Sequence, residues 1–158
     1  MLGSRGFLMM GFVLGIAVAF GSSNAFDVSI GAQSRHTGLY GGARPLAPYS
    51  PGVDSGETVY LSGQVGINPE TGSLHENLQA QARQALSNLE GLLTEAGLTK
   101  ANVVRATVYL DDIGNYPELN QVYGEFFEDV EVKPSRSTVG VAALPIGAAV
   151  EIDFIAVK

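Results

Sequence analysis

The part of the sequence that decides the fold reads KPSRSTVGVAALP over residues 133–145 and VEIDFIAV over residues 150–157. Both runs have strand composition, and Leu144-Pro145 with the small residues 147–149 predicts a turn between them. The two strands carry Arg136 and Glu151. If they pair, a guanidinium and a carboxylate lie near each other at one end of a sheet. The first can grip an organic carboxylate through two hydrogen bonds, and the second can handle a water proton.

Upstream of these strands, the pattern predicts a further strand and a long helix. Residues 58–67 alternate and hold glycines suited to a bend or a bulge, and residues 68–72 have turn composition. From residue 75 to residue 96 apolar residues recur every three or four positions, which predicts a helix that Gly97 terminates. The stripe of this helix consists of Leu78, Ala82, Leu86, Leu89 and Leu93.

Another strand and a second helix follow. Residues 102–110 alternate, and the row that contains Val104 and Ala106 is expected to form one side of a strand. Asn115 and Glu118 resemble a capping box at the start of a helix whose apolar stripe runs on to Val130. The order strand, strand, helix, strand, helix, strand, strand predicts an α+β fold in which both helices cover one face of the sheet.

Composition limits what the chain can do. Its 158 residues fit one globular domain, and the absence of cysteine excludes disulfides, thiolate metal sites and a cysteine nucleophile. The net charge of −7 repels phosphate backbones, so we expect no nucleic-acid partner. The two histidines, His36 and His75, lack acidic residues at metal-binding spacing, so no metal site is expected.

The first 25 residues have the composition of a signal peptide. Arg5 is the only charged residue before Asp27, residues 7–20 are apolar apart from glycine, and Ser23 and Ala25 have the spacing that a signal peptidase reads. We therefore expect a signal peptide at 1–25, a linker or arm at 26–44 and the domain at 45–158. The protein would be exported, to the periplasm or outside the cell, without a membrane partner once the leader is removed. An uncleaved membrane anchor and an organelle transit peptide are the alternatives.

The closing stretch also resembles the signature of the RidA/YjgF family, called L-PSP as well. That signature runs Pro-x-Arg-Ser-x-Val-x-Val-x-x-Leu-Pro and is followed by an apolar strand with a glutamate. Further blocks fall in family order at residues 47–53, 61–64, 68–72, 81–89 and 120–127, so the resemblance covers residues 44–158. It implies a chorismate-mutase-like α+β fold with a mixed sheet of about six strands, and a homotrimer with a central barrel. The last strand also suggests association, because its row with Ile155 and Val157 is more apolar than a solvated face requires.

The resemblance further implies a hydrolase that deaminates reactive 2-imino and 2-enamino acids to 2-oxo acids and ammonia, without a cofactor. Arg136 would bind the substrate carboxylate. Glu151 would orient or activate the attacking water, with its pKa held down by the nearby guanidinium. The remaining expected substrate-binding residues are Tyr49, Ser62, Gly63, Asn120, which would act across a subunit boundary, and Thr138. Each also has an ordinary structural explanation, such as a surface ion pair for Arg136.

Three positions depart from the family pattern. Thr138 stands where many relatives carry a cysteine, Gly140 replaces the usual glutamate, and Ala143 replaces a basic residue. We expect activity to survive, because the backbone at Thr138 can still serve a ligand.

Two other functions stay open at this point. Enzymes that generate such imines are normally cytosolic, so the leader favours an exported protein that binds small carboxylates or acts as a holdase without catalysis. The third candidate is an endoribonuclease, an activity reported for some relatives. The acidic charge and the lack of a basic, aromatic stripe argue against it.

Overall fold

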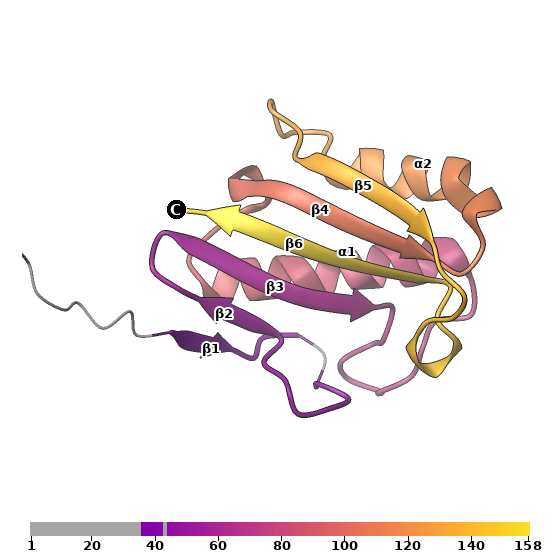
Figure 1. Ribbon diagram of the computed structural model, residues 1–158, viewed down its shortest axis with the longest axis horizontal. Coiled ribbons are helices and arrows are strands. Elements are labelled where there is room, and N and C mark those ends of the chain that lie inside the picture. The colour runs from indigo at the N-terminus through magenta and orange to yellow at the C-terminus, as the bar shows by residue number, and fades with distance from the viewer. Residues whose placement is uncertain (1–35, 43) are drawn as a thin grey trace, which may run out of the picture. The chain divides into compact units, whose positions relative to one another are not determined.

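The computed structural model describes residues 36–42 and 44–158, which form a mixed six-stranded sheet with both α-helices on one face (Figure 1). The elements are β1 (Thr37–Leu39), β2 (Gly52–Asp54), β3 (Thr58–Val65), α1 (Leu78–Glu95), β4 (Val103–Leu110), α2 (Tyr116–Phe126), β5 (Ser135–Gly140) and β6 (Val150–Val157). Across the sheet the strands follow the order β1-β2-β3-β6-β4-β5. All neighbours are antiparallel except β4 and β5. The predicted α+β class is confirmed, with three strands before α1 where two were expected.

β5 and β6 are not neighbours, so the condition under which Arg136 and Glu151 would lie near each other, pairing of the last two strands, is not met. β4 lies between them, and its Ala106 pairs with Arg136 on one side and with Phe154 on the other. The strands β4 and β5 are parallel because α2 carries the chain back between them, as a parallel pair requires. The predicted turn is present as a short 3-10 segment at Pro145–Gly147, where Ile146 has a φ of 53°.

Several local predictions are confirmed. The pairing of β3 with β6 shifts register between Leu61 and Gln64, so the glycine-containing bulge exists. Helix α1 begins at its cap Asn77, whose Oδ1 accepts a hydrogen bond from the amide of Ala80 at 2.9 Å. It is followed by Gly97 at a φ of 72°, the left-handed conformation that glycine adopts most readily.

Two local predictions are wrong. Asn115 makes no side-chain cap hydrogen bond to α2; the Asp112 side chain instead caps the preceding 3-10 turn through the amide of Gly114. Val104 is exposed, because the register between β4 and β6 shifts after Val103 and that residue takes the buried place. The alternation of β4 therefore holds only from Arg105 onward.

The strand β1 falls inside the stretch predicted to be a linker. It pairs with β2, and its Leu39 is buried in the core. The Glu95 carboxylate at the end of α1 accepts hydrogen bonds from the backbone amides of Tyr40 at 2.8 Å and Gly41 at 2.6 Å. The sheet thus begins before residue 45. The expected signal peptide lies outside the described residues, as does the expected linker up to residue 35.

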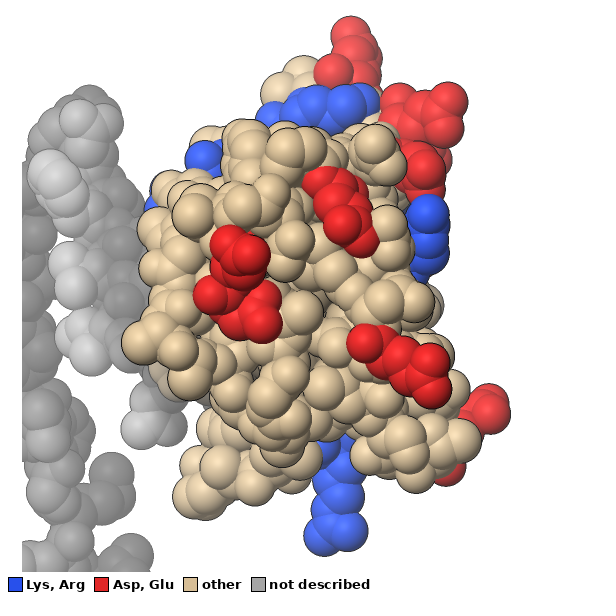
Figure 2. Space-filling model, turned by 90° about the vertical axis from the view of Figure 1, so that its right-hand side faces the viewer, with Lys and Arg blue, Asp and Glu red and all other residues tan. Residues whose placement is uncertain are grey.

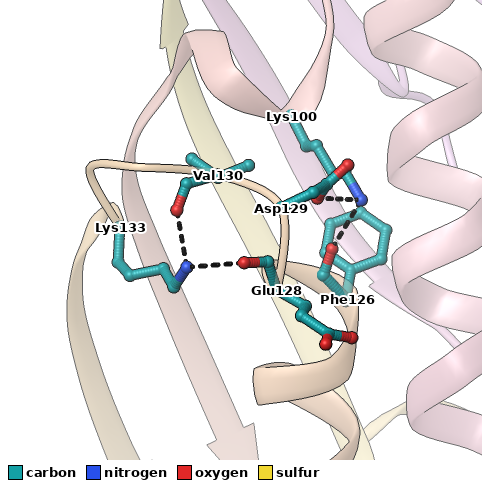
Figure 3. A network of polar contacts seen from close by, with 6 residues as sticks. All are labelled: Lys100, Phe126, Glu128, Asp129, Val130 and Lys133. Atoms are coloured by element: carbon teal, nitrogen blue, oxygen red, sulfur yellow. Dashed lines mark hydrogen bonds and ion pairs between the residues drawn. The ribbon is translucent and has the colours of Figure 1, made fainter.

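Lysine side chains hold the end of α2 and the chain that leads into β5 (Figure 3). Lys100 donates to the carbonyl of Phe126 at 2.8 Å and pairs with Asp129 at 2.6 Å. Lys133 donates to the carbonyl of Val130 at 2.5 Å. Carbonyls at a helix end have no intrahelical partner, and cations there also favour the helix dipole. These contacts hold the end of α2 beside the start of β4 and fold the connection that leads into β5.

The core lies between the sheet and the two helices. It is built from large side chains on both layers that are almost wholly buried, among them Leu86, Leu89, Phe127, Ile152 and Phe154. The opposite sheet face carries apolar residues with no helix over them; Tyr60 there is half exposed. Within residues 36–42 and 44–158, no helix has the length and apolar character needed to cross a bilayer.

Candidate functional site

Arg136 on β5 is held against α2 by three side chains. Its Nη2 donates to Asn120 Oδ1 at 2.6 Å and to the hydroxyl of Tyr116 at 3.1 Å. Its guanidinium carbon lies 4.4 Å from the centroid of the Tyr123 ring, close enough for a cation–π contact. We call these four residues the basic cluster. Both hydrogen bonds use one nitrogen, so the guanidinium is fixed in place while its other edge has donors for a ligand.

The basic cluster also changes the properties of its tyrosines. Burial raises the pKa of Tyr123 to about 12, although Arg136 opposes the change. The hydrogen bond from Arg136 is the main cause of a lowered pKa at Tyr116. Thr138 lies two residues beyond Arg136 on β5. In the described part of the chain, the hydroxyls of Thr138 and Tyr123 are buried and have no hydrogen-bond partner.

A pocket of about 340 Å³ lies at the end of β3 and the start of β6. Four of the predicted site residues line it together: Tyr49, Ser62, Gly63 and Glu151. We call these four residues the acidic pocket. A Cβ at Gly63 would lie 1.9 Å from Glu151 Oε1, so only glycine leaves this carboxylate its place. The Ser62 hydroxyl donates to the carbonyl of Ser50 at 2.9 Å and so ties β3 to the loop that follows Tyr49.

The pKa of Glu151 is raised, mainly because the carboxyl is partly buried and further because Asp153 lies nearby. The expectation that Arg136 lowers this pKa is therefore wrong in the single chain, where the guanidinium is not beside the carboxylate. A raised pKa makes Glu151 better suited to exchange protons near neutral pH than an ordinary glutamate.

The basic cluster and the acidic pocket lie on different faces of the sheet. Arg136 is in register with Ala106 and Phe154, which are buried beneath the helices. Glu151 is in register with Tyr109 on the other face, and β4 separates the two strands. Within one chain the structure thus places the two charged groups in separate clusters, one on each face of the sheet. The expected contact between Arg136 and Glu151 does not occur within the chain.

The structure adds Tyr116 and Tyr123 to the predicted site residues. A signal for them was present, because positions 116, 120 and 123 are spaced so that all three side chains share one face of a helix. Tyr123 lies on the apolar side of α2 and is 8% exposed. The sequence could not show that this face of α2 also contacts Arg136, because the contact depends on β5 lying beside α2.

A six-stranded α+β fold with one fixed guanidinium and one half-buried carboxylate defines a framework for small-molecule chemistry. The chain belongs to the Endoribonuclease L-PSP family, whose sequence pattern matches residues 41–158, and this confirms the expected family. It is similar to a RutC family protein of Aquifex aeolicus, with 48% identity over 114 residues that cover 72% of this chain and 91% of that protein.

Two further relatives are informative. The 2-iminobutanoate/2-iminopropanoate deaminase of Salmonella typhimurium is 40% identical over 114 residues, which cover 72% of this chain and 89% of that protein. The crystal structure of E. coli TdcF with bound serine has a TM-score of 0.74 and 34% identity, over 77% of this chain and 98% of that one. The family therefore includes an imine deaminase, and one similar structure holds a small amino acid.

Proposed function

We propose that the protein hydrolyses reactive 2-imino and 2-enamino acids to 2-oxo acids and ammonia. The observation that carries this proposal is the pair of preformed, oppositely charged half-sites in a chain similar to a named imine deaminase. A guanidinium fixed by Asn120 suits the carboxylate of the substrate. A partly desolvated carboxylate suits the proton transfers of the reaction.

The reaction needs few steps from the protein. Arg136 binds the substrate carboxylate and orients the C=N carbon. Glu151 takes a proton from water as the water oxygen bonds to that carbon, and it passes this proton to the nitrogen as the π bond breaks. In the resulting carbinolamine, Glu151 takes the hydroxyl proton as the C=O bond forms and gives it to the nitrogen, which leaves as ammonia as the C–N bond breaks. One water is consumed and one ammonia leaves, so the carboxylate acts as base and then as acid.

We further propose that the complete site forms between copies of the chain, in a homotrimer. The geometry within one chain supports a shared site, because β4 and the sheet itself keep Arg136 away from Glu151. The helix-free sheet face supports association, because it exposes Tyr60 and Val157. A second copy that brings its basic cluster to the acidic pocket of the first would supply both charges.

Complementation tests both proposals. Neither Arg136→Ala nor Glu151→Gln should release ammonia from freshly generated 2-aminoacrylate at the wild-type rate. If the two variants are unfolded and refolded together in equal amounts, about a quarter of the sites between copies should hold both native groups, and activity should return to that extent. Mixtures that stay as inactive as the single variants would contradict a shared site. An inactive wild-type protein would contradict the deaminase.

Binding without turnover would favour the alternative of a small-carboxylate-binding protein or holdase. Calorimetry with 2-oxobutanoate on the wild type and on Arg136→Ala measures that outcome. The family description names an endoribonuclease, which is the other candidate. The net charge of −7 and the acidic side chains spread over the surface in Figure 2, where lysine and arginine lie at the rim, do not favour a phosphate backbone as ligand.

A further inference from the structure

Glu151 has a second acidic residue on the same strand and the same sheet face. Asp153 lies two positions along β6, about 7 Å away at the usual strand rise. The Tyr109 hydroxyl on β4 donates to Asp153 Oδ2 at 3.1 Å. Tyr109 is also the register partner of Glu151, so one tyrosine packs beside the first carboxylate and bonds to the second.

The two carboxylates have different surroundings. On β3, the register partner of Glu151 is Val65, which is 8% exposed, and the ring of Tyr109 flanks it on β4. Glu151 accepts no hydrogen bond from any residue of 36–42 and 44–158, whereas Asp153 accepts one from Tyr109. A hydrogen bond to an ionised carboxylate favours its charged form, and an apolar setting favours the neutral form.

The other charged and titratable groups near this face make no ion pair with Glu151 among the described residues. Arg44, in the loop before β2, lines a small neighbouring cavity with Tyr49 and Gly63. Arg105, the basic residue of β4, donates to Ser137 on β5. Tyr60 of β3 pairs with Ile155, further along the sheet, and Tyr49 enters the pocket from the loop before β2. Asp153 is the charged neighbour that acts on Glu151, and it raises the pKa of that carboxyl in addition to the effect of burial.

We propose that Tyr109 and Asp153 are positioning residues that make Glu151, and not its neighbour, the carboxyl group that carries the catalytic proton. Tyr109 holds the Asp153 carboxylate in place through its hydrogen bond, and the nearby negative charge of Asp153 raises the affinity of Glu151 for the proton that it takes from water. Neither residue needs to touch the substrate. Two neighbouring carboxylates in different surroundings differ in proton affinity, and this difference decides which of them exchanges the proton. The inference rests on the proposed deaminase function for its consequence, but the ionisation itself does not depend on turnover.

The test is an NMR titration of the full chain with ¹³C-labelled side-chain carboxyls, in parallel with pH profiles of kcat/KM. The Glu151 signal is identified by its loss in Glu151→Gln. Asp153→Asn removes the negative charge, so the Glu151 titration and the acid limb of the rate profile should both move to lower pH. Glu90→Gln, which removes one charge from the exposed side of α1, should move neither by a comparable amount.

Tyr109→Phe is the second variant, and it keeps the ring while it removes one oxygen. The Glu151 titration should then move part of the way toward its position in Asp153→Asn, because the Asp153 carboxylate has lost the hydrogen bond that holds it in place. A Glu151 titration that is the same in wild type and Asp153→Asn, or that moves equally in Glu90→Gln, would overturn the inference. Because NMR reads the proton on Glu151 directly, an enzyme that proves inactive would contradict the proposed function while this result still decides the inference.

Discussion

The basic cluster and the acidic pocket differ in how their charged groups are satisfied. Arg136 has two hydrogen bonds and lies against the ring of Tyr123, all supplied by α2. Glu151 has no hydrogen-bond donor among the described residues and is partly desolvated beside another carboxylate. The charge of Arg136 is therefore stabilised before any ligand arrives, whereas the charge of Glu151 is destabilised.

The difference matches what each group has to do in the proposed reaction. A group that binds a ligand benefits from being fixed in advance, because binding then costs no free energy for ordering that side chain. A group that gives and takes a proton gains from a pKa nearer to the working pH, which burial and a like charge provide. Substitutions in the two regions should therefore have different effects on activity and on stability.

The largest effect is expected at Arg136. Arg136→Ala should lower kcat/KM for ammonia release by about 100-fold to 1,000-fold, because a charge-assisted bidentate contact contributes a few kcal/mol. Arg136→Lys keeps the charge but not the planar fork, and it should recover only part of the loss. Arg83→Ala is the control, since Arg83 pairs with Glu125 on the exposed surface of the helices. Equal rates for Lys and Arg at position 136 would show that charge alone suffices.

A smaller loss is expected in the acidic pocket from Gly63→Ala. The new methyl group would overlap Glu151 Oε1 and force the carboxylate to turn away, with a loss in kcat of about 10-fold to 100-fold. Gly124→Ala is the matched control, because a Cβ there meets nothing within 4 Å and alanine is the better helix former. A crystal structure of Gly63→Ala with Glu151 unmoved and full activity would contradict the prediction.

These two positions also show what the sequence could predict. Four residues were expected in one site because the motifs that contain them follow the family order. The structure brings these four together in one pocket: Tyr49, Ser62, Gly63 and Glu151. The neighbour of β6 was not predictable in the same way. A turn at residues 145–147 fixes a reversal of direction, but it does not say whether the next strand lies beside β5 or one strand away. That choice depends on α2, which makes β5 parallel to β4 and leaves the far edge of β4 free for β6.

Short-range errors had a different cause. The strand β1 has only three residues, too few to show a period of two, so it was assigned to a linker. Val104 was expected in the row of Ala106, and a one-residue register shift put Val103 there instead. The prediction that the pKa of Glu151 is lowered was also wrong. It took Arg136 as the charged neighbour, whereas the charged neighbour within the chain is Asp153.

A third prediction concerns stability: a substitution in the acidic pocket should raise Tm, and one in the basic cluster should lower it. The folded protein raises the pKa of Glu151 above its ordinary 4.5, so its ionisation opposes folding. This group contributes most to stability below its unfolded pKa, and the contribution is lost as pH rises through the folded pKa. Glu151→Gln should therefore have a higher Tm than the wild type at pH 7, and the gap should shrink toward pH 4.

The control for this measurement is Glu70→Gln, in the exposed turn before α1. Its Tm should follow that of the wild type at both pH values. In the basic cluster the sign is reversed: Arg136→Ala leaves Asn120 Oδ1 without its donor and should lower Tm. A Glu151→Gln protein that is less stable than the wild type at pH 7 would show that the carboxylate is not destabilised there.

The smallest effect is expected at Thr138, where the family pattern often has cysteine. The Thr138 hydroxyl is buried without a hydrogen-bond partner in the described part of the chain, so it contributes no bond to offset its desolvation. Thr138→Val keeps the shape and removes the hydroxyl, and the free energy of unfolding should rise by about 1 kcal/mol in urea denaturation. If the backbone at this position serves the ligand, kcat/KM should stay within about threefold of the wild-type value, since only the side chain changes.

Thr138→Ser separates the two roles that this residue could have. It keeps the hydroxyl but leaves a methyl-sized gap, so it should be less stable than Thr138→Val and equally active. Activity that survives in Thr138→Ser and falls tenfold in Thr138→Val would mean that the hydroxyl itself meets the substrate. The unpartnered oxygen would then be a binding group beside Arg136, kept at a cost to folding in the same way as Glu151.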